Sequence, residues 1–226
     1  MAIGDQLSDV KVLWGIAGCT NTSKILLTAA EKGVDVDGRS VDVNSEVEMS
    51  ELKKVSPFGS IPILKDADFY IYGTEAVMSY LDDKGFGHSL VPRNGLARAV
   101  NYQWSHIAST AFEPAVSKLT NGDDSAVDAV KQCLSALEAQ LNARTKRGDY
   151  IVGEFSLADI HWAPSIHALC LHGHESLIDC MPGVKAWWSS MKVRKSMSKE
   201  DYVAYTVLPS LDEIRSNILR SISINV

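Results

Sequence analysis

Apolar and polar residues follow two different patterns along this chain. In the first third, short β-rich runs alternate with stretches of helical pattern. The pattern predicts strands at 10–15 and 36–43, an apolar strand entered through Pro62, and a strand at 69–72. Helices are predicted at 22–32, 47–55 and 75–83, the first closed by Gly33. The order βαβαββα suits a small mixed sheet with helices on its faces, which matches a thioredoxin-like fold.

The second pattern is helical and begins near residue 96. Apolar residues recur every three or four positions along one face of a helix, at Val127, Val130, Leu134, Leu137 and Leu141. Similar stretches cover 96–112, 157–172 and 183–192. The predicted division is a thioredoxin-like domain over 1–84, a linker over 85–95 rich in Gly, Pro and turn formers, and an all-helical bundle over 96–226.

Two features of the helical part leave alternatives open. The tail after Pro209 has a weak helical pattern and is either a last helix over the site or a frayed end. Trp187 and Trp188 are adjacent, and neighbouring residues of a helix do not share a face. We therefore expect one of the two tryptophans to be exposed, or to cover a subunit contact or the tail.

Composition narrows the class of function. The chain has 226 residues, of which 46% are hydrophobic, and a net charge of -6, which argues against nucleic acid or an anionic membrane surface as the main partner. No apolar run approaches the roughly 18 residues needed to span a bilayer. The opening residues show no secretory signal, and four scattered cysteines do not form a disulfide scaffold. A reducing cytoplasm is the simplest compartment.

Residues 56–82 combine a proline inside an extended run with the start of a helix. Pro62 cannot donate to a strand ladder, and a cis Ile61–Pro62 bond would leave the backbone groups of Ile61 unpaired at an edge. Those groups could pair with the backbone of an extended peptide. Thr74 and nearby amides lie at a helix N-terminus, which favours a carboxylate. The segment therefore offers a peptide clamp beside a carboxylate site.

This segment resembles the glutathione-binding half of the glutathione S-transferase superfamily. The shared pattern is present at Pro57, Gly59, Ile61–Pro62, Leu64, Thr74, Ala76–Val77 and Tyr80–Leu81. Residues 148–160 resemble the family's capping box and hydrophobic staple, in which Ser156 caps a helix, Asp159 reaches back and Phe155 packs on Ile160. Residues 182–197 resemble its late helix. The resemblance covers residues 10–200 and implies a cytosolic enzyme of detoxification.

Cys19 joins the first predicted strand to the first predicted helix. A thiol there feels the positive end of the helix dipole and free N–H donors, which stabilise the thiolate. Thr20 and Asn21 could donate further hydrogen bonds to sulfur, either of Cys19 or of a bound thiol. The same residues equally fit a purely structural role. Cys19 would then be a small residue at the end of the strand, and Asn21 or Thr22 would cap the helix.

The resemblance favours the chemical role, because the family places its activating Tyr, Ser or Cys at this loop. The loop is similar to that of the omega-like branch, in which Cys19 would make and break mixed disulfides. It is also similar to that of the nu-like branch, in which hydroxyl and amide donors at Thr20 and Asn21 would activate the thiol of glutathione. Cys19 has no cysteine three residues on, so a second glutathione would have to resolve a mixed disulfide.

The resemblance also implies how glutathione would bind, as co-substrate and without a metal. Its backbone would lie along Ile61 and Pro62, and its γ-glutamyl carboxylate would lie at Thr74. The family usually has Glu or Gln directly before this Thr. Here Gly73 occupies that position and the acid follows Thr74, as Glu75. Lys53, or its neighbour Lys54, would pair with the glycyl carboxylate.

Two further groups of residues could carry chemistry. Tyr102 and His106 on the first bundle helix would line a substrate pocket in the manner of relatives, although an aromatic stripe is more often core. His167, Cys170, His172 and His174 could be read as metal ligands, but they lack the paired close spacings of a structural zinc site. We therefore expect no metal there.

The favoured function is a glutathione-dependent transferase or thiol–disulfide oxidoreductase that acts on a small hydrophobic electrophile or a mixed disulfide. One alternative is a non-catalytic binding module in a protein complex. The other is a specialised catabolic enzyme, such as a glutathione-dependent dehalogenase, ether-cleaving enzyme or isomerase. The resemblance also implies a homodimer.

Overall fold

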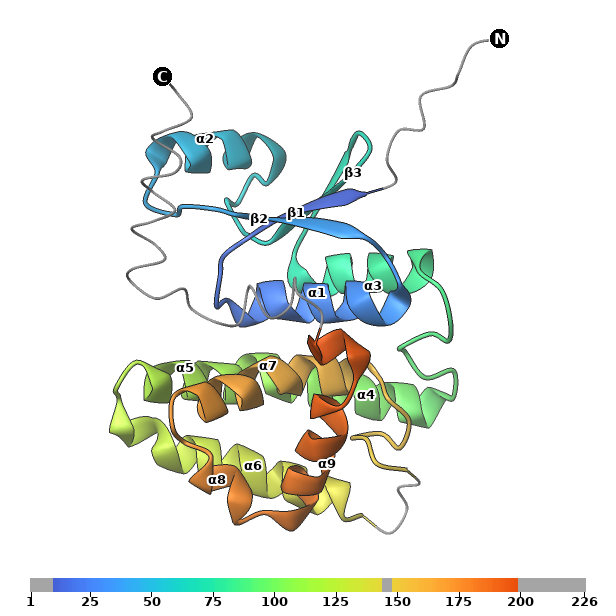
Figure 1. The fold of residues 1–226 in the computed structure, drawn as a ribbon, viewed down its shortest axis with the longest axis vertical. Coiled ribbons are helices and arrows are strands. Elements are labelled where there is room, and N and C mark those ends of the chain that lie inside the picture. Colours follow the sequence, from blue (N-terminus) through green and yellow to red (C-terminus); the bar gives the residue numbers. More distant parts are fainter. Residues whose placement is uncertain (1–9, 144–147, 199–226) are drawn as a thin grey trace.

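A four-stranded sheet and a helical bundle lie on opposite sides of helix α1 in the computed structural model, which describes residues 10–143 and 148–198 (Figure 1). The first unit follows the predicted order and is thioredoxin-like. Its elements are β1 (Lys11–Gly15), α1 (Thr20–Lys32), β2 (Val36–Ser40), α2 (Glu46–Val55), β3 (Ile63–Asp66), β4 (Phe69–Tyr72) and α3 (Thr74–Lys84). The predicted fold class is confirmed.

The strand order is β2-β1-β3-β4, with β1 and β2 parallel and the other pairs antiparallel. Leu13 and Leu64 point into the main core with α1 and α3, whereas Ile63 belongs to a smaller core with Leu52 of α2. The two sides of the sheet are thus covered by different helices, as the alternation of side chains along β3 requires.

The second unit is helical, as predicted. It consists of α4 (Gly95–Ile107), a π-helical turn η1 (Ala108–Phe112), α5 (Glu113–Thr120), the short η2 (Asp124–Ala126), α6 (Val127–Leu141), α7 (Leu157–Leu171), α8 (Ser176–Asp179), α9 (Pro182–Lys192) and η3 (Lys195–Ser198). Helices α1, α4, α5 and α9 contact α7, whose residues are buried along most of its length. None of the helices in the described ranges is long and apolar enough to cross a membrane. The tail after Pro209 lies outside the described residues.

The connection between the two units is held by buried polar groups. Lys32 Nζ of α1 donates to Asp82 Oδ1 of α3 and to the carbonyl of His88, each at 2.9 Å. Asp82 also accepts the N–H of Leu90 at 2.8 Å, and the carbonyl of Leu90 accepts from Leu157 N at the start of α7. These bonds anchor the segment 85–94 to both units.

Both adjacent tryptophans of α9 are buried, so the expectation that one of them is exposed was wrong. Trp187 is 1% exposed and Trp188 is 5% exposed. Helices α6, α7 and α8 all contact α9, so two neighbouring faces of this helix are covered. Trp187 Nε1 donates to Asp159 at 2.8 Å, while the ring of Trp188 lies 6.0 Å from that of His167.

Asp159 forms the predicted capping box and does more than cap. Its Oδ2 accepts from the N–H of Ser156 at 2.9 Å, and its Oδ1 accepts from the N–H of Ile151 at 3.0 Å and from Trp187. Full burial raises the pKa of Asp159 to about 6, although these hydrogen bonds oppose the shift. The carboxylate of Asp159 therefore joins the turn that contains Ile151 to the start of α7 and to α9.

Replacing this carboxylate is expected to lower the free energy of unfolding by more than the loss of an ordinary helix cap does. Asp159→Ala leaves several buried donors without an acceptor, so we expect the free energy of unfolding to fall by about 3 to 5 kcal/mol, against about 1 kcal/mol for a cap alone. Urea denaturation measures the loss. Asp123→Ala is the matched control, because Asp123 caps η2 at the surface. Equal losses in the two variants would contradict the buried role.

Candidate functional site

Three loops of the first unit meet at one edge of the sheet. The register pairs Trp14 of β1 with Ile63 of β3, and Ile63 with Tyr72 of β4. The end of β1, the start of β3 and the end of β4 are therefore neighbours. The loops attached to these strand ends contain Cys19, Ile61–Pro62 and Gly73–Thr74. The fold thus brings the predicted reactive group, clamp and carboxylate site to the same edge.

The loop before α1 is packed closely against the helix that follows it. A Cβ on Gly15 would come within 2.5 Å of the Thr22 side chain, so only glycine fits there. Thr22 Oγ1 accepts from Ile16 N at 3.2 Å, and Gly18 turns the chain with φ 76°. Cys19 follows as the N-cap residue of α1, half-buried and with no side-chain capping bond. Its thiol therefore lies at the start of the helix, as predicted.

The clamp turn lies at the start of β3. The Ile61–Pro62 bond is cis, Pro62 is buried and Ile61 is half-buried. The strand ladder begins only at Ile63, so Ile61 lies outside it. The buried hydroxyl of Ser56 donates to the carbonyl of Ser60 at 3.0 Å, and this hydrogen bond stabilises the turn.

The carboxylate site lies where β4 passes into α3. Thr74 is the first residue of α3 and is 8% exposed. Gly73 is the N-cap residue with φ 90°, and a Cβ there would meet nothing within 4 Å. The side chain of Glu75 is exposed in the first helical turn. The free N–H groups of this turn can receive an anion, with open space in front of Gly73.

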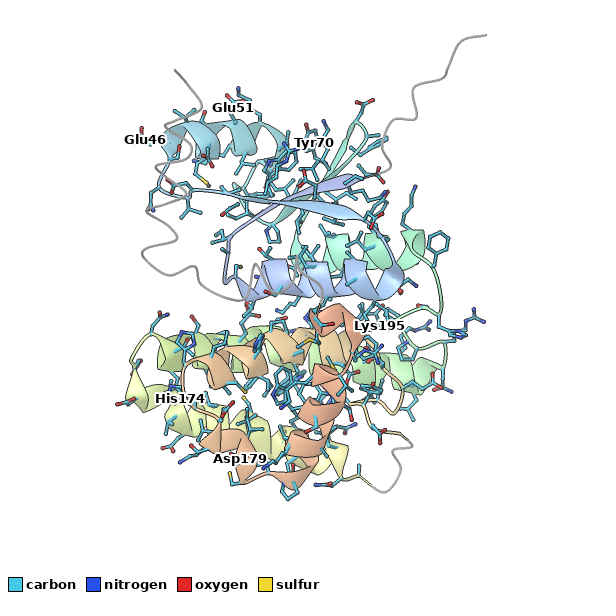
Figure 2. All side chains as sticks on the ribbon, in the orientation of Figure 1. Glu46, Glu51, Tyr70, His174, Asp179 and Lys195 are labelled. Atoms are coloured by element: carbon cyan, nitrogen blue, oxygen red, sulfur yellow. The ribbon has the colours of Figure 1, made fainter. Side chains whose placement is uncertain are left out.

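Of the two candidate lysines of α2, Lys53 lies nearer the clamp. Its Cε is 3.3 Å from the position that a Cβ on Gly59 would take. Lys54 instead pairs with Glu51 at 2.5 Å. Glu51 lies on the outer side of α2 (Figure 2). Lys53 is exposed and can reach a ligand at the clamp turn, whereas Lys54 is engaged at the surface.

The side chains of Thr20 and Asn21 are bound by the protein itself. Thr20 Oγ1 donates to Glu113 Oε1 at the start of α5, so its one hydroxyl proton is used there and the expected donation to sulfur is not made. Asn21 Oδ1 accepts from Lys24 Nζ at 3.1 Å. Lys24 is fully buried and pairs with Glu113 Oε2 at 2.5 Å. Asn21 retains its amide N–H groups as donors.

A second layer of this cluster comes from η1 and α7. Lys24 Nζ lies 3.5 Å from Ser109 Oγ, which lies 3.2 Å from His161 Nδ1. Burial, followed by the charge of Lys24, lowers the pKa of His161 to about 3, so this imidazole is neutral. Sequence reasoning assigned no role to Lys24, Glu113, Ser109 or His161. The one available signal was a lysine within the apolar stretch after Ser23, because its partners lie far away in the sequence.

Comparison with known proteins agrees with this geometry. Residues 18–84 match the family model for the glutathione S-transferase N-terminal domain, and residues 103–194 match that for its C-terminal domain. Glutathione S-transferase F14 of Arabidopsis thaliana is 31% identical over 206 residues, which cover 83% of this chain and 79% of that protein. The chain belongs to the glutathione S-transferase family.

Solved structures of the family extend the likeness to the fold. Glutathione transferase F7 from Populus trichocarpa has a TM-score of 0.74 at 26% identity, and the match covers 88% of this chain and all of that one. Glutathione S-transferase I, bound with lactoylglutathione, has a TM-score of 0.74 at 25% identity, covering 83% and 96%. The similarity is to plant phi-class enzymes, and the omega-like or nu-like assignment of the Cys19 loop is not supported.

Tyr102 and His106 are exposed on the face of α4 opposite to the bundle core. Tyr102 is 57% exposed, while Asn101, Trp104 and Ser105 form the buried face. Neither residue lines a pocket described here, so their assignment to a substrate pocket stays a prediction.

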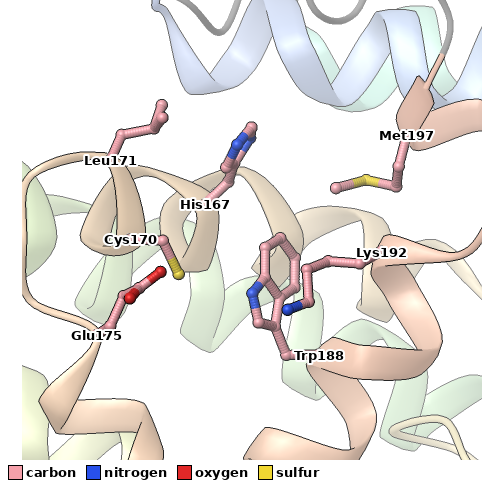
Figure 3. A pocket seen from close by; sticks show the side chains of 7 residues that line it. All are labelled: His167, Cys170, Leu171, Glu175, Trp188, Lys192 and Met197. Carbon is pink, nitrogen blue, oxygen red and sulfur yellow. The ribbon is translucent and has the colours of Figure 1, made fainter.

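A separate pocket of about 310 Å³ lies between α7 and α9 (Figure 3). It contains His167 and Cys170 beside Trp188 and Lys192. Burial is the main cause that raises the pKa of Cys170 and lowers that of His167. Within the described ranges, no group of three or more His, Cys, Asp or Glu side chains could hold a metal ion.

Proposed function

We propose that this chain is a glutathione transferase whose thiol site is formed by Cys19, Asn21, the Ile61–Pro62 turn and Thr74. The observation that carries the proposal is the meeting of three loops at one edge of the sheet, which provides a thiol-binding helix start, a backbone clamp and a carboxylate site together. Its cysteines are free in the structure, in keeping with a reducing cytoplasm.

Glutathione would bind in an extended form. Its backbone amides would pair with Ile61, in the manner of a strand added to an edge. Its γ-glutamyl carboxylate would accept hydrogen bonds from Thr74 and the first amides of α3, and its glycyl carboxylate would pair with Lys53. This pose directs the sulfur toward Cys19 and Asn21.

The proposed reaction is conjugation. The start of α1 and the amide N–H groups of Asn21 would stabilise the thiolate of glutathione, which attacks an electrophilic carbon. A C–S bond forms, and the leaving group departs with its bonding electron pair. In the oxidoreductase version, the Cys19 thiolate attacks the glutathione sulfur of a mixed disulfide between glutathione and the substrate, so the substrate thiol leaves and a disulfide between Cys19 and glutathione forms. A second glutathione then attacks that glutathione sulfur, which forms glutathione disulfide and releases the Cys19 thiolate.

Titration with reduced glutathione by calorimetry tests the carboxylate site. We expect Thr74→Ala to weaken binding about tenfold to a hundredfold, because a hydrogen bond to a charged group contributes about 1.5 to 3 kcal/mol. Ser79→Ala, on the exposed side of the same helix, is the control and should bind as the wild type does. Equal affinity in all three proteins would place the ligand elsewhere.

A different outcome of that titration supports the binding-module alternative. The open space at Gly73 motivates it, since no side chain there can hold the amino group of the ligand. Absence of detectable heat with the wild type, together with retention of a tight protein partner, would make a non-catalytic role the better proposal. Conjugation of any model electrophile would exclude it.

The role of Cys19 separates the two reactions. Cys19→Ser is expected to abolish disulfide reduction, because serine cannot form a mixed disulfide, while conjugation falls less than about tenfold since the helix start and Asn21 remain. Rates with a mixed disulfide and with an aryl halide measure the two activities. Cys180→Ser is the control, because Cys180 is exposed outside the site. Unchanged rates in both assays would remove Cys19 from the mechanism.

We also propose that the protein is a homodimer through the surface around Phe58. This ring is 84% exposed, although it lies in the clamp turn, and such an apolar side chain fits a subunit contact. We expect Phe58→Ser to yield monomers in analytical ultracentrifugation, because it removes the aromatic side chain that the proposed dimer would bury. Phe86→Ser, at a ring that is 81% exposed in the linker, should leave the dimer intact. A wild-type monomer would contradict the proposal.

A further inference from the structure

Helix α1 is tied to the helical unit by an ion pair at each end. Near its start, Lys24 pairs with Glu113 of α5 at 2.5 Å. Near its end, Glu31 pairs with Arg194, which follows α9, at 2.6 Å. Both pairs join the same two units, but only the first lies beside the loop of Cys19. If the first pair only attaches α1 to the helical unit, loss of either pair should have the same effect on the site.

The first cluster binds both residues that follow Cys19. The ammonium group of Lys24 has three N–H donors, and its three acceptors are Asn21 Oδ1, Ser109 Oγ and Glu113 Oε2. The second oxygen of Glu113 accepts the hydroxyl proton of Thr20. A carboxylate of the helical unit therefore fixes Thr20 directly and Asn21 through Lys24.

The chemistry of Lys24 fixes the orientation of the Asn21 amide. Lys24 can only donate, so the oxygen of the Asn21 amide faces it and the NH₂ group is the end left for a ligand. Ser109 Oγ accepts from Lys24 and lies 3.2 Å from Nδ1 of the neutral His161, within hydrogen-bonding distance. Ser109 belongs to the π-helical turn, a feature that is frequent at functional sites.

We propose that Glu113 and Lys24 are positioning residues of the thiol site, which orient the Asn21 amide and the first turn of α1 from the helical unit. This inference rests on the proposed function, because the group to be positioned is a donor to the sulfur of glutathione. Glu113 acts through Thr20 and Lys24 rather than by contact with the ligand. Without it, Lys24 loses its charged partner and the amide of Asn21 loses its fixed orientation.

The second cluster is the natural control. Arg194 donates to both oxygens of Glu31, at 2.7 and 2.6 Å, and to Tyr150 Oη at 2.7 Å. Ser196 Oγ also donates to Glu31. This cluster is as well connected as the first, yet it contacts no residue of the Cys19 loop. Loss of the second cluster should weaken the attachment of α1 to the helical unit without disturbing the thiol site.

Steady-state kinetics of glutathione conjugation to 1-chloro-2,4-dinitrobenzene compare Glu113→Gln with Glu31→Gln, well below their melting temperatures. We expect Glu113→Gln to lower kcat about tenfold or more while the KM for glutathione changes less than about threefold. The reason is that a misplaced Asn21 amide slows the chemical step more than it weakens binding of glutathione. Glu31→Gln should keep kcat within about twofold. Equal loss of kcat in both variants would overturn the inference, since it would indicate that both ion pairs only attach α1 to the helical unit.

Two further variants keep the test valid if Glu113→Gln folds poorly. Thr20→Val removes the hydroxyl bond but leaves the ion pair, and it should lower kcat in the same direction. Lys24→Met and Glu113→Gln form a double-mutant cycle, in which the double variant should be no slower than the slower single one, because the two residues act as a unit. Additive losses of kcat would contradict this.

Alkylation of Cys19 by iodoacetamide, followed by mass spectrometry without glutathione, is independent of the proposed function. Because Cys19 directly precedes the helical turn that Glu113 holds, we expect Glu113→Gln to change the alkylation rate of Cys19 at least about threefold, and Glu31→Gln to leave it unchanged. If the wild type neither binds nor conjugates glutathione, the proposed function fails, and this rate alone decides the inference. An unchanged rate in Glu113→Gln would then overturn it.

Discussion

The ion pair between Lys24 and Glu113 is the constraint on which the arrangement of the site depends. A fully buried ammonium group is tolerated only when it is paired and hydrogen-bonded, so the position of Lys24 on α1 requires Glu113 of α5 beside it. This requirement fixes the start of α1 against the helical unit. It also determines which polar atoms near Cys19 remain available to a ligand.

The same principle holds at the other buried charges. Asp159 joins the 151 turn, α7 and α9 because four donors converge on its two oxygens. The pair of Lys32 and Asp82 anchors the connection between the units. The pairs Lys24–Glu113 and Lys32–Asp82 join α1 to the helical unit and to the connection that leads to it, so α1 lies between the thioredoxin-like unit and the helical bundle (Figure 1).

The fold and the positions of the Cys19 loop, the clamp turn and the start of α3 could be predicted because their signals are local. Periodicity identified the order of strands and helices, and the stretch from Pro57 to Thr74 specified a turn and a helix start by backbone chemistry. Cys19 was placed at the start of α1 for the same reason. The errors were non-local. Thr20 looked free to donate to sulfur, and Trp187 and Trp188 were not expected to face the core together.

By itself, the sequence determined the two-unit architecture, the clamp turn and the family, because spacing and backbone-restricting residues act within a few positions of one another. Tertiary structure alone decided how the side chains after Cys19 are used. Glu113 lies far along the chain from Thr20 and Lys24, and nothing in its neighbourhood marks it as their partner. A hydrogen bond between distant segments depends on how the helices pack, so only the folded chain selects which donor is spent and which is left for a ligand.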